Sequence, residues 1–153
     1  MQEYIKTLQR ASGEVYTVFK QAATTGRNPD RAYDELAEKY KGTVAEEYVS
    51  EYCKICKEEL PGIKNPQSYF AEAQKATAES WKVFKAHVGK LYQGEMTERD
   101  WNLLIKDATE VGYKKWDLAV KEYAKRYSAL CVWELDRQYQ RLHHIKKDWY
   151  EYV

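Results

Sequence analysis

The second half of the chain, residues 95–153, decides the fold class. It reads EMTERDWNLLIKDATEVGYKKWDLAVKEYAKRYSALCVWELDRQYQRLHHIKKDWYEYV. This stretch contains no proline and a single glycine, Gly112, while apolar residues recur every three or four positions almost throughout. Such spacing places the apolar side chains on one face of an α-helix. The sequence therefore predicts an all-α protein whose function lies on helix faces rather than in loops.

One uninterrupted helix over residues 98–150 would be about 80 Å long, at about 1.5 Å per residue. Because helices of that length are rare in small domains, we place a break near Gly112 and expect a long C-terminal helix after it. The run Ala129–Trp133 is apolar on all sides of this helix. It is therefore predicted to lie at the centre of the fold.

Residues 1–94 are divided into helices by apolar spacing and by turn residues. Two predicted helix starts combine an asparagine cap with proline, at Asn28-Pro29 and at Asn65-Pro66, and Thr43 with Glu46 has the spacing of a capping box. The predicted helices cover about residues 2–24, 29–41, 43–60, 66–93 and the part after Thr97. The whole chain, 1–153, is thus predicted to be a single domain, an irregular bundle of five or six amphipathic helices.

Gly13 lies in the middle of the first apolar stripe. Glycine inside a helix costs stability relative to alanine. We therefore expect Gly13 to mark a close helix contact or a slight bend. In the helix that follows Thr97, the residues predicted to face inward are Trp101, Leu104, Ile105 and Ala108.

Composition excludes several classes of protein. With 44% apolar and 32% charged residues, the chain is typical of a folded soluble protein, and its formal net charge is +1. No apolar run approaches the roughly 20 residues needed to cross a membrane, and the amino terminus, MQEYIKTLQR, has no apolar export segment. Three cysteines, an odd number, fit reduced thiols, so we expect a cytoplasmic protein without membrane contact.

The cysteines form one recognisable motif, Cys53-Lys54-Ile55-Cys56. A zinc site needs about four ligands, and a second such pair is absent, although Cys131 with His143 or His144 could complete a set. A redox role would need a strand-rich context that the pattern does not show. Because Cys56 lies on the apolar stripe of its helix, we expect structural cysteines, no metal site and no cofactor.

The sequence carries no catalytic signature. It has no E-x-x-H, H-E-x-x-H or G-x-S-x-G motif and no phosphate-binding glycine loop. His144 and Asp148 are four residues apart and could bind a metal or move a proton, but histidines on a polar, basic helix are more typical of a solvated surface. Paired carboxylates lie near helix ends, where capping explains them. We therefore expect that the protein is not an enzyme.

Aromatic residues are unusually frequent, with 14 tyrosines, 5 tryptophans and 3 phenylalanines. Most are predicted to border the core, with the ring buried and the hydroxyl near solvent. Others lie beside the apolar stripes and are predicted to be accessible: Tyr4, Tyr16, Tyr48, Tyr69, Tyr92, Tyr113, Tyr150 and Tyr152. Since tyrosine, tryptophan and arginine are enriched at protein interfaces, this favours a non-enzymatic interaction protein, an adaptor or an inhibitor that covers a partner's surface. The small size and the helices rich in lysine, glutamate and tyrosine would fit a phage or mobile-element protein, an expectation that rests on composition alone.

The candidate partner-binding residues lie in the C-terminal segment. Residues 113–153 carry nine basic and six acidic side chains, a net charge of +3. The candidates are Arg137, Arg141, Lys146, Lys147, Trp149, Tyr150 and Tyr152. An alternative is nucleic-acid binding, in which this basic helix contacts phosphates and its aromatic side chains stack on bases. The long amphipathic helix could also pair with a second copy of the chain.

Overall fold

A computed structural model of the chain describes the backbone of residues 1–151 and the side chains of residues 1–143. Over this range the regular elements are all helical, so the all-α prediction is confirmed. The elements are α1 (Gln2–Thr25), α2 (Asp30–Tyr40), α3 (Glu46–Glu59), a short 3₁₀ turn η1 (Leu60–Gly62), α4 (Pro66–Tyr92), α5 (Glu98–Gly112) and α6 (Leu118–Glu151). Within these described residues, none of the helices is long and apolar enough to cross a bilayer.

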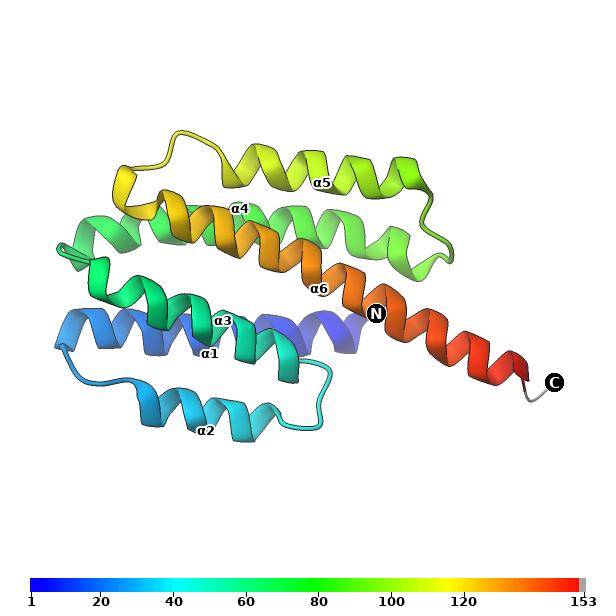
Figure 1. The fold of residues 1–153 in the computed structure, drawn as a ribbon, viewed down its shortest axis with the longest axis horizontal. Helices are drawn as coiled ribbons and strands as arrows, with labels where there is room; N and C mark the ends of the chain where they lie inside the picture. The colour runs from blue at the N-terminus through cyan, green and yellow to red at the C-terminus, as the bar shows by residue number, and fades with distance from the viewer. Residues whose placement is uncertain (152–153) are drawn as a thin grey trace.

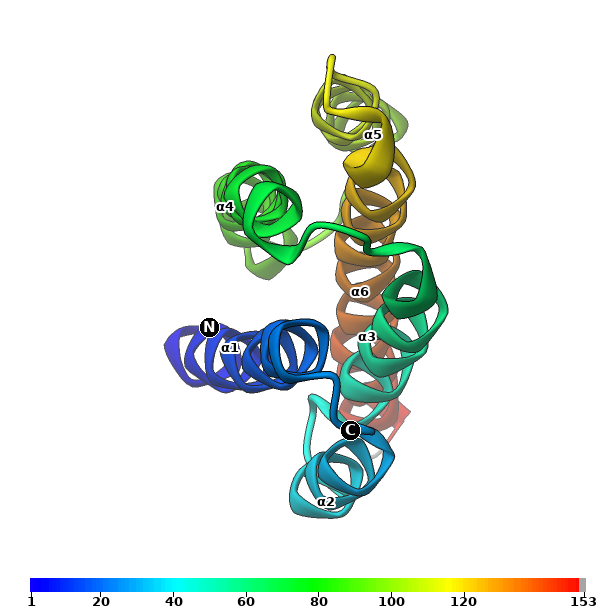
Figure 2. The same cartoon turned by 90° about the vertical axis from the view of Figure 1, so that its left-hand side faces the viewer.

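The helices form two layers. Seen end on, α5, α6, α3 and α2 form one layer, and α4 and α1 lie against one side of it (Figure 2). The long helix α6 crosses the bundle diagonally and packs against α3, α4 and α5 (Figure 1). Consequently α6 is the central helix of the fold, whereas α2 and α5 are outer helices at opposite ends of the layer.

Several helix starts agree with the predicted caps. The Asn65 side chain accepts a hydrogen bond from the Ser68 amide at 3.2 Å, and α4 begins at the proline that follows. Thr97 and Asp100 form a reciprocal capping box at the start of α5. The box predicted at Thr43 is wrong, because that hydroxyl donates to the carbonyl of Tyr40 and accepts from the amide of Ala45 in the turn before α3.

The predicted break at Gly112 is confirmed, since α5 ends there and α6 begins at Leu118. Gly112 is buried against α6. A Cβ atom at this position would lie 3.3 Å from the Cβ of Ser128 and 3.4 Å from the Cα of Lys125. Because these distances are tight and one of the two atoms belongs to the backbone, glycine allows α5 to approach α6 closely at this end.

We expect Gly112→Val to lower the free energy of unfolding by about 1–3 kcal/mol, because the added methyl groups must push α5 away from α6. Chemical denaturation followed by circular dichroism measures this loss. Gly89→Ala is the matched control, since no described heavy atom lies within 4 Å of its Cβ position. The control is expected to stabilise α4 slightly. Equal effects of the two changes would contradict the close contact at Gly112.

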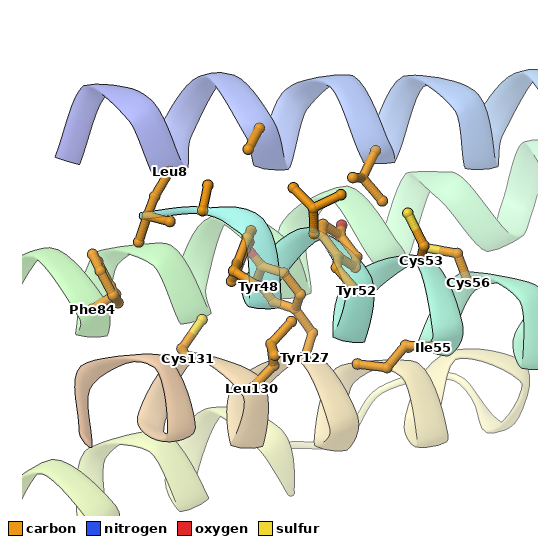
Figure 3. Close-up of a cluster of buried hydrophobic side chains, with 14 of the residues drawn as sticks. Leu8, Tyr48, Tyr52, Cys53, Ile55, Cys56, Phe84, Tyr127, Leu130 and Cys131 are labelled. Carbon is orange, nitrogen blue, oxygen red and sulfur yellow. The ribbon is translucent and has the colours of Figure 1, made fainter. Parts of the chain in front are cut away.

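The core is rich in aromatic residues. Phe19, Tyr48, Tyr52, Tyr123 and Tyr127 are all fully buried. Figure 3 shows part of this core, where Tyr48 and Tyr52 of α3 lie near Tyr127 of α6, below α1. Within the core, Tyr123 and Tyr127 stack on one another at a ring distance of 6.0 Å, one turn apart on α6. Phe19 of α1 stacks in turn on Tyr123 at a ring distance of 5.8 Å, so aromatic packing joins the two layers.

Two hydrogen-bonded chains of hydroxyl groups run through this core, and we call them the core hydroxyl chains. They are Tyr48–Tyr127–Ser12, with oxygen–oxygen distances of 2.9 and 3.0 Å, and Tyr52–Tyr123–Thr77, with 2.8 and 2.6 Å. Burial raises the pKa of all four tyrosines well above the ordinary value. These hydroxyls therefore stay protonated and satisfy one another inside the fold.

The accessibility predicted for several tyrosines is wrong. Tyr4, Tyr48 and Tyr69 are buried, with exposed fractions of 5%, 1% and 3%. Tyr16 and Tyr92 pack partly against the core, whereas Tyr113 is 66% exposed, as predicted. A single narrow stripe underestimates the buried surface of a helix that contacts more than one neighbour, as α1, α3 and α4 do.

Two predictions about α5 and α6 also need correction. Ile105, predicted to face inward, is 50% exposed, although Leu104 and Ala108 are buried. In the run predicted to lie at the centre of the fold, Leu130 and Cys131 are buried but Ala129 is exposed. The outward side of both helices lacks a neighbour among the described helices, because α5 is the outermost element of its layer (Figure 2).

Candidate functional site

The structure describes the side chains of two of the seven residues predicted to bind a partner, Arg137 and Arg141. The other five, Lys146, Lys147, Trp149, Tyr150 and Tyr152, lie outside the described side chains. Their part in binding stays a prediction.

Arg137 lies between an aromatic ring and a carboxylate. Its guanidinium is 5.1 Å from the centre of the Trp133 ring and pairs with Glu47 of α3. Eleven residues earlier on α6, Arg126 donates a hydrogen bond to Glu58 of α3 at 2.6 Å. Both arginines therefore join α6 to α3 and are partly neutralised there.

Arg141 pairs with a fully buried acid on its own helix. Its Nη2 donates to Oε2 of Glu134 at 2.7 Å, and the Tyr4 hydroxyl of α1 donates to the same oxygen at 2.6 Å. Glu134 is 0% exposed, and burial raises the pKa of its carboxyl, while the hydrogen bond from Tyr4 and the charge of Arg141 oppose that rise. Arg141 therefore has a structural partner that sequence spacing did not reveal.

These pairings affect the predicted nucleic-acid surface. Three arginines of α6, Arg126, Arg137 and Arg141, already bind carboxylates within the protein. Phosphate binding would have to compete with those carboxylates, since the affinity for nucleic acid comes mainly from cations free to neutralise phosphates. Nucleic-acid binding stays an alternative prediction, with less charge available to it than the sequence suggests.

The cysteines are all free and buried. Burial raises the pKa of Cys53 to about 11 and that of Cys131 to about 12, and it raises the pKa of Cys56 well above its ordinary value. Thiols with raised pKa values are poor nucleophiles and poor metal ligands. Within the described part of the chain, no group of three His, Cys, Asp or Glu side chains could hold a metal ion. His143 instead packs against the ring of Tyr139 at 4.0 Å.

The most conspicuous exposed apolar surface lies on α5 and the first half of α6. Ile105, Tyr113 and Leu118 are 50%, 66% and 86% exposed. On α6, residues 118, 125, 129 and 132 lie on one side of the helix, because they are spaced by three, four or seven positions. We call this surface the α5–α6 face and define it by Ile105, Tyr113, Leu118, Lys125, Ala129 and Val132.

A pocket of about 300 Å³ opens in this face between the two helices. Its walls include Ile105, Tyr113 and Val132, and Gly112 and Ser128 also line it. Lys125 is the one charged side chain among the described residues that line it, and its Nζ lies 5.5 Å from the centre of the Tyr113 ring. The pocket has room for one apolar side chain of a partner, next to a positive charge.

The sequence contained part of this surface. Tyr113 lies beside the apolar stripes and is predicted to be accessible, but the spacing predicts an inward position for Ile105 and nothing for Leu118. The exposed apolar position at the first residue of α6 is a signal that could have been found, because Leu118 lies outside the stripe that runs through Val120 and Tyr123.

No protein-family model, curated protein or solved structure matches this chain. The molecule is defined by its fold as an all-α protein with two helical layers. A fold of this class does not specify a function, so function has to be argued from individual sites.

Proposed function

We propose that the protein is a non-enzymatic helical interaction protein that binds a protein partner through the α5–α6 face. The observation that carries this proposal is the exposure of Ile105 and Tyr113 at a pocket, with Leu118 exposed on the same side of α6 as Lys125. Large apolar side chains grouped on the surface of a folded protein mark interaction sites. The protein acts in this view as an adaptor or inhibitor, in the cytoplasm, where its free cysteines remain reduced.

The chemistry of the face defines the partner segment. An apolar side chain of the partner fills the pocket between α5 and α6, and the ring of Tyr113 covers it. A carboxylate beside that side chain lies near Lys125, the charged group at the pocket. The preferred partner is therefore a segment with an apolar side chain that fills the pocket and an acidic residue next to it. The buried apolar side chain would act as the binding hot spot, and the acidic residue would complement the charge of Lys125.

A pair of aspartate substitutions on α5 tests the proposal. Ile105 and Leu103 lie on the same helix with exposed fractions of 50% and 51%, but only Ile105 lines the pocket. We expect Ile105→Asp to weaken partner binding at least about 30-fold, which corresponds to a hot-spot loss of about 2 kcal/mol. Leu103→Asp is expected to change it by less than about threefold.

The partner is first recovered from nuclease-treated lysate of the native host and identified by mass spectrometry. Its affinity for the wild-type protein and both variants is then measured with purified components. Equal loss in the two variants, or none, would reject the α5–α6 face. Recovery that disappears with nuclease would instead support the basic helix, and unimpaired binding by Ile105→Asp combined with loss in Trp149→Ala would support the C-terminal site.

A further inference from the structure

A second and larger hollow lies on the other layer, between α1 and α4. These helices run antiparallel, since Tyr4 packs near Phe84 at 6.1 Å and Phe19 packs near Phe70 at 5.1 Å. A groove of about 700 Å³ opens along these two helices, lined by residues between Gln9 and Thr25 of α1 and between Gln74 and Trp81 of α4. It shares no lining residue with the pocket of the α5–α6 face, so the two sites can be tested separately.

Both core hydroxyl chains end in this groove. Ser12 and Thr77, the ends of the two chains, line it, and so does Tyr127, which is the fully buried middle member of the first chain. Thr77 donates to the carbonyl oxygen of Ala73 at 2.8 Å and therefore accepts from the Tyr123 hydroxyl at 2.6 Å, so it has no proton left to donate to a bound molecule. The groove therefore has polar groups at defined positions, as ligand sites do.

The groove is lined by aromatic rings and by residues with small side chains. Tyr16 of α1 and Trp81 of α4 line the groove, and one face of Trp81 stacks on Phe84 at 4.7 Å with an interplanar angle of 10°. Ala78 and Gly13 lie at positions where larger side chains would fill the space. This arrangement suits a flat ring better than a bulky branched group.

Gly13 explains how the groove stays open. The close helix contact expected for this residue is absent, because no described heavy atom lies within 4 Å of its Cβ position. Glycine in the middle of a helix costs about 0.5–1 kcal/mol relative to alanine. No packing contact in the described structure requires glycine here, and its effect is to leave the groove without a side chain at its midpoint.

The charge of the groove is unusual for this chain. A neighbouring hollow of about 350 Å³ shares Lys20, Thr24 and Gln74 with the groove. The two together are lined by 18 different described residues, 14 from the groove and four more from the hollow. A charged fraction of 32% would place about six charged residues among 18, yet Lys20 is the single charged one among them and no carboxylate lines either space.

We propose that this groove binds a small aromatic monocarboxylate. The carboxylate pairs with Lys20, the one cation at the site, and no acidic side chain among the described lining residues competes for it. The ring system lies over Gly13 between Tyr16 and Trp81. Residues 13 and 20 are about 10 Å apart along the helix axis, so a molecule of two fused rings with one carboxylate spans the required distance.

Naphthalene-2-carboxylate and its neutral carboxamide are the probes that test this proposal. We expect saturable binding of the carboxylate at or below about 1 mM, measured by titration in ¹H–¹⁵N correlation spectra, with the largest shifts in α1 and α4. The carboxamide should bind about fivefold to tenfold more weakly, because it lacks the charge that Lys20 recognises. Lys20→Gln should remove this difference and Lys20→Arg should preserve it.

Two substitutions at Gly13 separate binding from folding. Gly13→Leu adds a side chain to the groove in a region without packed neighbours, so it should leave the fold intact. We expect it to lower the affinity for naphthalene-2-carboxylate at least tenfold. Gly13→Ala adds one methyl group, should stabilise α1 and should weaken binding less. Lys85→Gln, an exposed change on α4 outside the groove, is the control for net charge and should bind as the wild type does.

Several results would overturn the proposal. The assignment of a carboxylate ligand to this groove would be wrong if no saturable binding were seen or if the two probes bound equally well. It would also be wrong if Lys20→Gln still preferred the carboxylate to the carboxamide. If Gly13→Leu folds and binds as well as the wild type, the probe lies elsewhere. Should Gly13→Leu fail to fold, Gly13→Ala and the location of the spectral shifts decide the same question.

Discussion

Replacing Arg141 with methionine is expected to lower the free energy of unfolding by about 3–5 kcal/mol at neutral pH. The change removes the cation that pairs with Glu134 at 2.7 Å, while that carboxylate remains fully buried. Methionine retains much of the apolar contact of the arginine stem. Denaturant unfolding of the two proteins at the same pH measures the difference.

The loss of stability in Arg141→Met should depend on pH, and the pair between Arg141 and Glu134 determines its direction. Burial raises the pKa of Glu134 in the folded state, and Arg141 counteracts that rise. Without Arg141 the folded-state pKa rises further above the unfolded value, so the folded state binds the proton more tightly. Stability of the variant is then greatest below the unfolded pKa, and it falls as pH rises through the folded pKa. The deficit relative to wild type should therefore be smaller near pH 5 than near pH 8.

Two further variants serve as controls. Glu134→Gln with Arg141→Met removes both charges, and its stability should exceed that of Arg141→Met alone and lack the added pH dependence. Arg31→Met breaks the pair between Arg31 and Glu35, whose side chains are 93% and 70% exposed, and should change stability by less than about 1 kcal/mol. A similar small effect of Arg141→Met would show that Glu134 is not held by this arginine.

Phe19→Ala is expected to cost about 3–5 kcal/mol as well. Phe19 is fully buried on α1, and its ring lies 5.1 Å from that of Phe70 and 5.8 Å from that of Tyr123. Truncation leaves a cavity between α1, α4 and α6, and the surrounding rings are too rigid to fill it. Thermal and chemical unfolding measure the loss.

Tyr113→Ala is the comparison for this effect. It removes a ring of similar size, but Tyr113 is 66% exposed, so stability should change by no more than about 0.5 kcal/mol. A loss below about 1 kcal/mol for Phe19→Ala would mean that α1 moves in to close the cavity. In that case the groove between α1 and α4 would be expected to change shape in the same variant.

Helix positions were predictable because their determinants are local. The Asn65-Pro66 start and the break after Gly112 each depend on residues adjacent in the sequence, and the structure confirms both. Caps act within one helical turn, so sequence spacing is sufficient to recognise them. The Thr43 box failed because the hydroxyl had a second local partner, the Tyr40 carbonyl.

Burial was less predictable because it depends on how many neighbours a helix has. Tyr48 and Tyr4 lie beside the apolar stripes of their helices, but a second neighbouring helix covers them. The opposite happens to Ile105, since α5 packs on one side alone of the described bundle. Helical periodicity identifies the centre of an apolar face and leaves its width undetermined.

Local sequence patterns were sufficient to predict an all-α fold, the approximate helix boundaries and a long C-terminal helix, because helical hydrogen bonding and capping act between residues close in the chain. The packing of the helices establishes which arginines pair with carboxylates and which hydroxyls bond to one another, as in Arg126–Glu58 and Tyr48–Tyr127. It also decided where the α1–α4 groove and the α5–α6 face lie. These features join residues far apart in sequence, and such contacts arise only when the packing of the helices brings those residues together.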